Sequence, residues 1–217
     1  MKACMPENER DAWNQRYRDG SHGGSDPDRF LLKSYEEFIE PLFPAGGAAL
    51  DVAGGAGRHA VYLAERAWQV TLTDISEVGI ERARQRAKAY GATLDFLPGD
   101  ARSLDFGRER FDLVMVFFYL ERDILPRLAA ALRPGGLIIY KTYTREHEKF
   151  AIHGLSHPTY FLGDNELLQA FPGFRVLHYR ESASGRGIAE LVARKPGGAA
   201  KFCGSLPASV PSRKFDA

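Results

Sequence analysis

The stretch Ala48-Ala-Leu-Asp-Val-Ala-Gly-Gly-Ala-Gly-Arg-His-Ala60 is the part of the chain around which the fold is organised. A short apolar run reaches Asp51 and then breaks into glycines at positions 54, 55 and 57, which is typical of a strand that ends in a turn before a helix. Glycine accepts positive φ and has no Cβ, so the backbone can lie against a ligand, and the free N–H groups of the next helix point to the same place. The stretch therefore predicts a small-molecule site.

Two kinds of ligand fit this loop. Its pattern Gly55-x-Gly57-x-x-Ala60 fits the dinucleotide-binding fingerprint, with alanine as the third small residue. Its pattern Asp51-x-Ala53-x-Gly55-x-Gly57 resembles motif I of the class I S-adenosylmethionine (SAM) methyltransferases, in which most members have glycine at the place of Ala53. Each pattern alone is weak evidence, so the rest of the chain has to distinguish them.

Composition indicates one globular α/β domain with a small-molecule partner. The chain has 217 residues, of which 44% are hydrophobic, and a net charge of +1, so no global field attracts nucleic acid or an anionic membrane. The longest apolar run, 113–120, is too short to cross a bilayer, and the N-terminus lacks the apolar segment of a signal peptide, so we expect a cytoplasmic protein. Nothing in the sequence indicates an oligomeric state.

Metal binding is not expected. The two cysteines, Cys4 and Cys203, have no zinc-like spacing, and Gly154 and Pro158 interrupt any helix that would present His153 and His157 together.

Hydrophobic patterns alternate between strands and helices along the chain. Strands are expected at 48–51, 69–74, 92–97, 111–120, 132–140, 172–181 and 188–194. Helices are expected at 30–43, 60–67, 80–90, 121–132 and 164–171, the last one capped by Asp164. We expect a domain at 30–195, followed by a flexible tail at 196–217. The N-terminal segment at 1–29 contains Trp-x-x-Arg-Tyr at 13–17, which resembles the lid of many small-molecule methyltransferases, and this resemblance implies a lid segment.

Two later motifs favour SAM, whereas a third feature, Asp74, fits a dinucleotide equally well and does not distinguish the two ligands. Asp74 ends the second strand, where an α/β nucleotide site needs a ribose ligand, although it also suits a helix N-cap shared with Ser76. Gly99-Asp-Ala101 follows the third strand, where class I methyltransferases bind adenine; an Asx-turn without a ligand is the alternative. The turn 132–136, Leu-Arg-Pro-Gly-Gly, is distinctive of SAM-dependent methyltransferases.

The whole chain from about residue 11 to 195 resembles the class I SAM-dependent methyltransferases, and most closely the TehB-like (tellurite-resistance, thiopurine-type) small-molecule enzymes. The resemblance rests on Trp-x-x-Arg-Tyr at 13–17, the loop at 51–60, Tyr-Leu-Glu-Arg-Asp at 119–123 and the stretch 132–143. It implies a Rossmann-like, mostly parallel seven-stranded sheet in the order 3-2-1-4-5-7-6, with strand 7 antiparallel and helices on both faces.

The same resemblance implies the site residues. The cofactor-binding set is Trp13, Arg16, Tyr17, Asp51, Ala53, Gly54, Gly55, Gly57, Arg58, Asp74, Ile75, Asp100, Ala101 and Phe117. The candidates for the substrate pocket are Tyr17, Phe118, Tyr119, Tyr143 and Arg186, with the stretch 147–160 beside them. Plain helix packing for residues 13–17 and a solvated surface position for Arg186 are the alternatives.

The expected reaction is in-line transfer of a methyl group from SAM to a small nucleophile, leaving S-adenosylhomocysteine. A thiol or a selenium or tellurium oxyanion is the expected acceptor class, and such a nucleophile arrives ionised, so no general base is expected. The sequence lacks the Asp/Asn-Pro-Pro-Tyr/Phe turn of enzymes that methylate planar amino groups. The alternatives are an NAD-dependent oxidoreductase and a SAM-binding protein without turnover.

Overall fold

The structure is a computed structural model that describes residues 9–20, 22, 24–149, 160–182 and 186–197. The expected tail beyond 197, both cysteines, His153 and His157 lie outside the described residues. Among the described helices, none is long and apolar enough to span a membrane.

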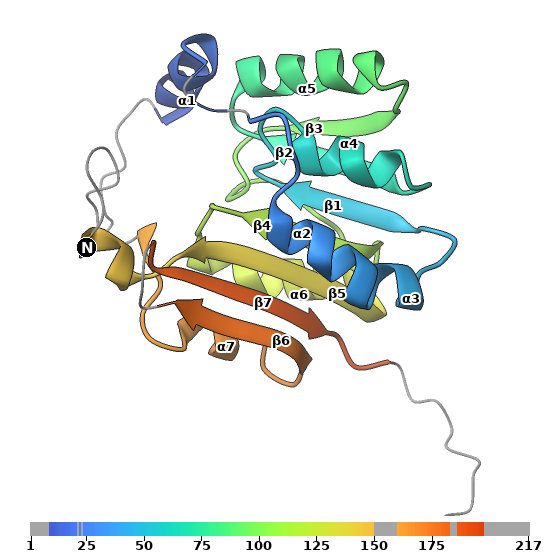
Figure 1. The fold of residues 1–217 in the computed structure, drawn as a ribbon, viewed down its shortest axis with the longest axis vertical. Helices are drawn as coiled ribbons and strands as arrows, with labels where there is room; N and C mark the ends of the chain where they lie inside the picture. The colour runs from blue at the N-terminus through green and yellow to red at the C-terminus, as the bar shows by residue number, and fades with distance from the viewer. Residues whose placement is uncertain (1–8, 21, 23, 150–159, 183–185, 198–217) are drawn as a thin grey trace, which may run out of the picture.

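A single seven-stranded sheet forms the centre of the domain, in the order β3-β2-β1-β4-β5-β7-β6 (Figure 1). The strands are β1 Ala48–Val52, β2 Gln69–Asp74, β3 Leu94–Pro98, β4 Phe111–Phe117, β5 Leu132–Tyr143, β6 Arg175–Ser182 and β7 Ile188–Arg194. Strands β1 to β5 pair in parallel, whereas β7 is antiparallel to both β5 and β6. The predicted strand order and the antiparallel seventh strand are confirmed, and a sheet that continues in parallel, as dinucleotide binding predicts, is not found.

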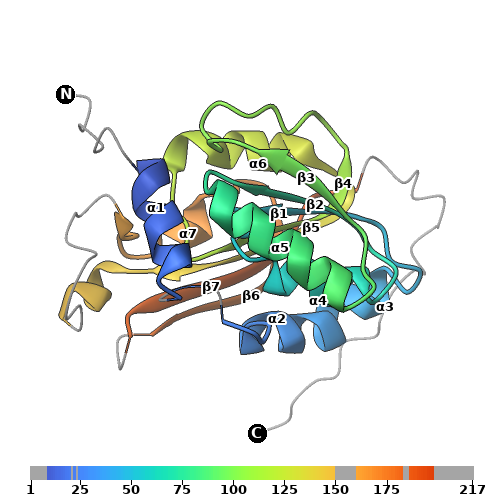
Figure 2. The same cartoon turned by 90° about the horizontal axis from the view of Figure 1, so that it is seen from above.

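Helices cover both faces of this sheet (Figure 2). They are α1 Glu9–Arg18, α2 Arg29–Ser34, η1 Tyr35–Ile39, α3 Glu40–Leu42, α4 Arg58–Ala64, α5 Glu77–Ala89, η2 Arg122–Ile124, α6 Leu125–Ala131, η3 Arg145–Lys149 and α7 Glu166–Gln169. Apolar residues of α2, α4 and α5 pack on one face and those of α6 and α7 on the other, which gives two buried clusters. The alternation of elements in the sequence therefore produces a doubly wound domain.

Three local features differ from the sequence prediction. The central strand β4 ends at Phe117, because the backbone of Phe118 turns into the left-handed region at φ +57°. The expected helix at 30–43 contains a π turn at η1. The expected cap at Asp164 is wrong: Asn165 precedes α7, and the Glu166 side chain accepts the Gly163 N–H at 2.7 Å instead.

The N-terminal helix α1 lies against α5 rather than against the sheet. Buried Asn14 accepts hydrogen bonds from the Ser76 hydroxyl at 2.8 Å and from the Val78 N–H at 3.2 Å, at the start of α5. This polar contact fixes α1 beside the carboxyl ends of β1 and β2, next to the glycine loop.

Candidate functional site

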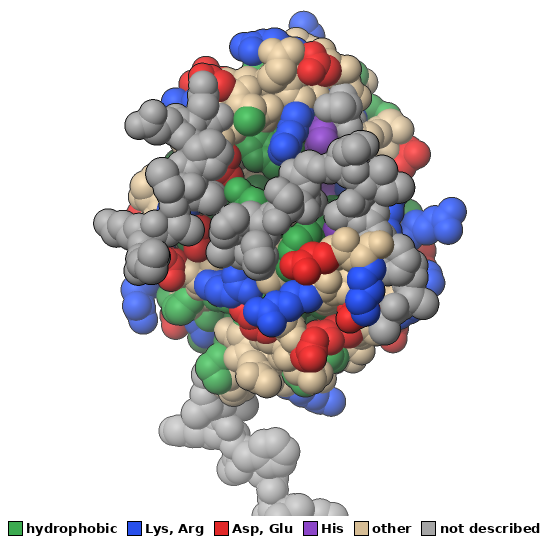
Figure 3. Space-filling view, turned by 90° about the vertical axis from the view of Figure 1, so that its left-hand side faces the viewer, with side chains coloured by type: hydrophobic (Ala, Val, Ile, Leu, Met, Phe, Trp, Pro, Cys, Tyr) green, Lys and Arg blue, Asp and Glu red, His purple; other side chains and the backbone are tan. Residues whose placement is uncertain are grey.

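A pocket opens at the carboxyl ends of β1, β2 and β4, where the strand order reverses between β1 and β4. We call it the glycine-loop pocket; its empty volume, including the part open to solvent, is about 980 Å³. Figure 3 looks onto this edge of the molecule, where apolar, histidine and cationic side chains meet. Crevices at such switch points are the usual ligand sites of open α/β sheets.

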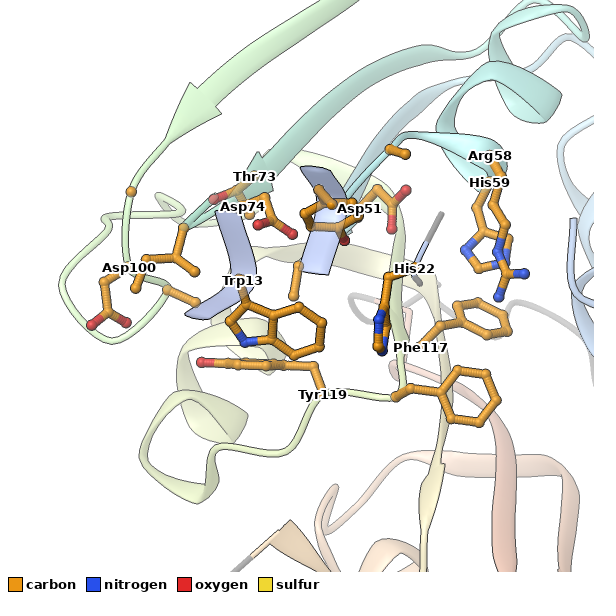
Figure 4. A pocket seen from close by; sticks show the side chains of 18 of the residues that line it. Trp13, His22, Asp51, Arg58, His59, Thr73, Asp74, Asp100, Phe117 and Tyr119 are labelled. Atoms are coloured by element: carbon orange, nitrogen blue, oxygen red, sulfur yellow. The ribbon is translucent and has the colours of Figure 1, made fainter. Parts of the chain in front are cut away.

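Most residues of the predicted cofactor set line this pocket. Those that line it are Trp13, Tyr17, Asp51, Ala53, Gly54, Arg58, Asp74, Ile75, Asp100, Ala101 and Phe117. Arg16, Gly55 and Gly57 lie outside the lining set: Arg16 belongs to helix α1, and the two glycines belong to the loop itself. Figure 4 shows Asp100 at one end of the pocket, Arg58 and His59 at the other, and Asp74 and Asp51 between them.

The glycine loop needs its small residues for steric reasons. A Cβ on Gly54 would lie 2.7 Å from the Asp51 carboxylate, and one on Gly55 would collide with the Tyr17 hydroxyl. Gly55 and Gly57 adopt φ of +54° and +73°, and Ala53 adopts φ of +53°. A non-glycine residue in this region costs about 1–2 kcal/mol, which gives a physical reason for the glycine that most motif I sequences have at the place of Ala53.

Asp51 is a buried carboxylate with an unsatisfied oxygen. Only 1% of the residue is exposed, and Oδ2 has no hydrogen-bond partner among the described residues. Burial, followed by the negative charge of Asp74, raises the pKa of Asp51 to about 7. A buried polar atom without a partner is costly, so this oxygen indicates a ligand with a donor or a positive charge.

The stability of the ligand-free protein should depend on this carboxyl. In the unfolded chain Asp51 loses its proton near pH 4, whereas in the native state it keeps it to about pH 7, so the free energy of unfolding is expected to fall as pH rises between these values. In Asp51→Asn the free energy of unfolding should fall less between these pH values, and the variant should be more stable than wild type above pH 7. Urea unfolding across this range, with exposed Asp95→Asn as the control, measures it. A variant at position 51 that follows the wild-type profile contradicts the assignment.

Asp74 holds the loop in shape while keeping lone pairs for a ligand. Its Oδ2 accepts the Gly55 N–H and its Oδ1 accepts the Ser76 N–H, both at 2.8 Å. Burial raises its pKa to about 6, against these backbone hydrogen bonds. The cap of α5 itself is Ser76, whose side chain accepts the Gly79 N–H. Asp74 therefore bridges the glycine loop and the start of α5.

Asp100, at the far end of the pocket, is already paired. The Arg102 guanidinium donates to both of its carboxylate oxygens at 2.6–2.9 Å and reaches Glu9 of α1 at 3.1 Å. Hydrogen bonds from Arg102 hold the pKa of Asp100 below its usual range, although burial acts the other way. The pair fixes the carboxylate and connects the β3 turn to α1.

Helix α1 presents an aromatic face to the pocket. Trp13 and Tyr17 have ring centroids 6.2 Å apart, and the Arg16 guanidinium lies 4.6 Å from the Trp13 ring. The predicted shared face is therefore confirmed. Burial, together with the negative charges of Asp74 and Asp51, raises the pKa of Tyr17, so its hydroxyl stays protonated over the loop.

Aromatic side chains form the end of the pocket beyond β4. Phe118 and Tyr119, two of the candidates for the substrate pocket, line it. Tyr143 lies outside the lining set, but its ring packs 5.0 Å from that of Phe118 and 4.0 Å from that of His147. Arg186 also lies outside the lining set; its positive charge acts on Tyr143 and His147. Among the described residues, no group of acidic, histidine or cysteine side chains is arranged to hold a metal ion.

Several lining residues were missed by the sequence analysis. They are Glu9, His22, Ala56, His59, Thr73 and Gly99. His59 is the most informative: it is 4% exposed, its ring lies 4.2 Å from that of Phe117, and its Nε2 has no described partner. Burial and the positive charge of Arg58 lower its pKa to about 3, so the imidazole is neutral. The sequence did offer one sign of this role: His59 stands in the first turn of α4, whose following residues are mainly apolar.

Comparisons with known proteins point to one family. Residues 49–136 match the family model described as a methyltransferase domain. The tRNA 5-carboxymethoxyuridine methyltransferase of Escherichia coli (strain K12) is 30% identical over 148 residues, which cover 64% of this chain and 54% of that protein. The ubiquinone biosynthesis O-methyltransferase of Methylobacterium sp. (strain 4-46) is 32% identical over 118 residues, covering 52% and 47%. The chain thus spans about half the length of these curated relatives.

Solved structures agree on the fold. TehB from Haemophilus influenzae superposes with a TM-score of 0.64 at 16% identity, covering 84% of this chain and 67% of that one. At this identity the similarity concerns the fold alone.

Proposed function

The chain belongs to the class I SAM-dependent methyltransferases, and from this premise we propose that it binds SAM in the glycine-loop pocket and methylates a small-molecule nucleophile. The observation that carries the proposal is the charge of the pocket. Glu9, Asp51, Asp74 and Asp100 line it, whereas Arg58 is its one arginine and no lysine lines it among the described residues. A cationic sulfonium with an ammonium group suits such a pocket, and the two phosphates of a dinucleotide would face Asp51 and Asp74 across the loop.

A residue at the pocket is available to bind each part of SAM. The unsatisfied Oδ2 of Asp51 would accept the ammonium group, and Arg58 would pair with the carboxylate. Asp74 has lone pairs left for the ribose hydroxyls, and Ile75 offers an apolar surface to the adenine, with Asp100 and Ala101 at its edge. The glycines at 54, 55 and 57 have no side chains, so the methionine part of SAM could lie directly against the backbone.

The lid segment is proposed to close the pocket. Tyr17 lies against Gly55 of the glycine loop, Trp13 lines the same pocket, and the Arg102–Glu9 ion pair ties the same helix to Asp100. Excluding water from the pocket strengthens every electrostatic contact within it and holds the reactants in line.

When bound, SAM supplies an activated methyl group on a sulfonium sulfur. The chain has to orient the acceptor and keep water out. Phe117 and neutral His59 line the pocket near the end of β4 and place no additional positive charge there. Phe118 and Tyr119 give the acceptor end an aromatic wall, with Tyr143 behind Phe118. We propose a thiol or a selenium or tellurium oxyanion as the acceptor, because such nucleophiles need no general base.

An acceptor screen tests the proposal. The protein is incubated with SAM and separately with thiols, selenite, tellurite, phenols, amines, a quinol and bulk tRNA, and S-adenosylhomocysteine is measured by mass spectrometry. We expect product with a thiol or with one of the oxyanions, and much less with Asp74→Ala. Product with tRNA or the quinol alone would overturn the acceptor class. SAM binding without product in any arm would favour the SAM-binding protein without turnover.

A further inference from the structure

A second pocket, the α2 pocket, is lined by residues of α2 and of the outer strands β5, β6 and β7. Its empty volume, including open space, is about 560 Å³, and it shares no lining residue with the glycine-loop pocket. The proposed methyl transfer assigns no role to it.

The lining of the α2 pocket carries more positive than negative charge. Arg29 and Lys33 project from one face of α2, and Arg180 from β6 lines the same pocket. No carboxylate in the described part of the chain lies within ion-pair distance of these three. Lys141 at the floor is neutralised instead, by Asp28 at 2.9 Å and Glu190 at 3.0 Å. Glu37 also lines the pocket, and Glu190 is the cross-strand partner of Arg180, so the four basic side chains of the lining face two acidic ones.

Two buried polar atoms in the wall have no partner. Ser34 is 1% exposed and its hydroxyl makes no hydrogen bond to a described residue, although a helical serine commonly bonds back to its own helix. The Nε2 atom of His178 on β6 is also buried without a partner, and its ring lies 5.4 Å from that of Phe30. The Ser34 hydroxyl and, in the tautomer protonated at Nε2, the His178 imidazole can both donate, and such donors beside the rim cations indicate an anion with several acceptor oxygens.

We propose that the α2 pocket binds a small ligand through a phosphate group. A phosphate dianion offers three or more acceptor oxygens, enough for rim cations on both sides of the pocket together with the Ser34 hydroxyl and the His178 imidazole. A carboxylate offers two oxygens in one plane and could not serve both sides. The α2 pocket shares no lining residue with the glycine-loop pocket, so we expect this ligand and SAM to bind independently.

Calorimetry of the full chain at low ionic strength tests the site, with inorganic phosphate, phenyl phosphate and sulfate as probes. We expect phosphate to bind and the double variant Lys33→Ala/Arg180→Ala to weaken it at least about tenfold. The matched control Lys88→Ala/Arg108→Ala removes two exposed cations elsewhere and should leave the affinity unchanged. Tighter binding of phenyl phosphate than of phosphate would identify a phosphomonoester as the ligand, and the reverse would identify the free anion.

Three results would overturn the proposal: no detectable phosphate binding, equal loss in the control variant, or loss of phosphate binding when SAM is added. Because SAM binding is measured separately, failure of the α2 pocket is distinguishable from failure of the SAM pocket.

Ser34→Ala gives a second, independent readout. If the hydroxyl serves a ligand, removing it should weaken phosphate binding while the Tm of the ligand-free protein rises or stays the same, since an unsatisfied buried group is lost. A lower Tm with unchanged phosphate affinity would mean that Ser34 has a structural role, and would contradict the site.

Discussion

Replacing Asp74 by alanine is expected to weaken SAM binding at least about tenfold while the domain stays folded. The ribose of SAM would lose the charge-assisted hydrogen bonds that it donates to the carboxylate, each worth about 1.5–3 kcal/mol. The Gly55 N–H, now bonded to Asp74 Oδ2 at 2.8 Å, would also lose its partner, so the loop that carries the methionine part would be less ordered. The fold should persist because Ser76 still caps α5 through the Gly79 N–H.

Asp74→Asn is the matched control for shape. Its amide oxygen can still accept one backbone N–H, so we expect an affinity between those of wild type and the alanine variant. Circular dichroism verifies the fold and calorimetry measures SAM affinity. An alanine variant that binds SAM as tightly as wild type would mean that the ribose is held elsewhere.

Gly54→Ala is expected to be the most damaging small change in the glycine loop. The added Cβ would lie 2.7 Å from both the carboxylate carbon and Oδ2 of Asp51, and 3.0 Å from a Leu72 methyl group. Asp51 is buried and cannot swing into solvent, so the loop or the strand end must move. Overpacking of this kind costs about 1–3 kcal/mol, and the cradle for SAM is lost with it.

Gly197→Ala provides the control, because a Cβ at Gly197 meets nothing within 4 Å. Urea unfolding and SAM titration of both variants measure the effects; we expect at least about tenfold weaker SAM binding for Gly54→Ala, since a loss of 1.4 kcal/mol is a factor of ten. If Gly54→Ala bound SAM with wild-type affinity, the loop would accommodate an added methyl group and would not be in close contact with the ligand.

Much of the fold was predictable from local patterns. The limits of β2 and β7 agree with the sequence prediction residue for residue, because apolar alternation and flanking turns define them. The strand order came instead from a resemblance to a family, since pairing across the sheet is not encoded locally. The early end of β4 depends on the positive φ of Phe118, which no propensity indicates for a phenylalanine.

The site was predictable in its acidic residues and less so in their partners. Asp51 lies near the end of β1, Asp74 ends β2 and Asp100 follows β3, and parallel strands bring their carboxyl ends to one edge. The pairing of Asp100 with Arg102 and Glu9 could not be anticipated, because Glu9 is 93 residues away from Arg102 in the chain. The α2 pocket was not predicted at all, because its residues come from α2, β5, β6 and β7 and share no sequence motif.

The central claim is that the glycine-loop pocket binds SAM, and one calorimetric experiment tests it most directly. The full chain is titrated with SAM and, in parallel, with NADH, and the SAM titration is repeated on Asp74→Ala. We expect saturable binding of one SAM per chain, no binding of NADH, and a marked loss of SAM affinity in the variant. Binding of NADH with no heat from SAM would contradict the claim.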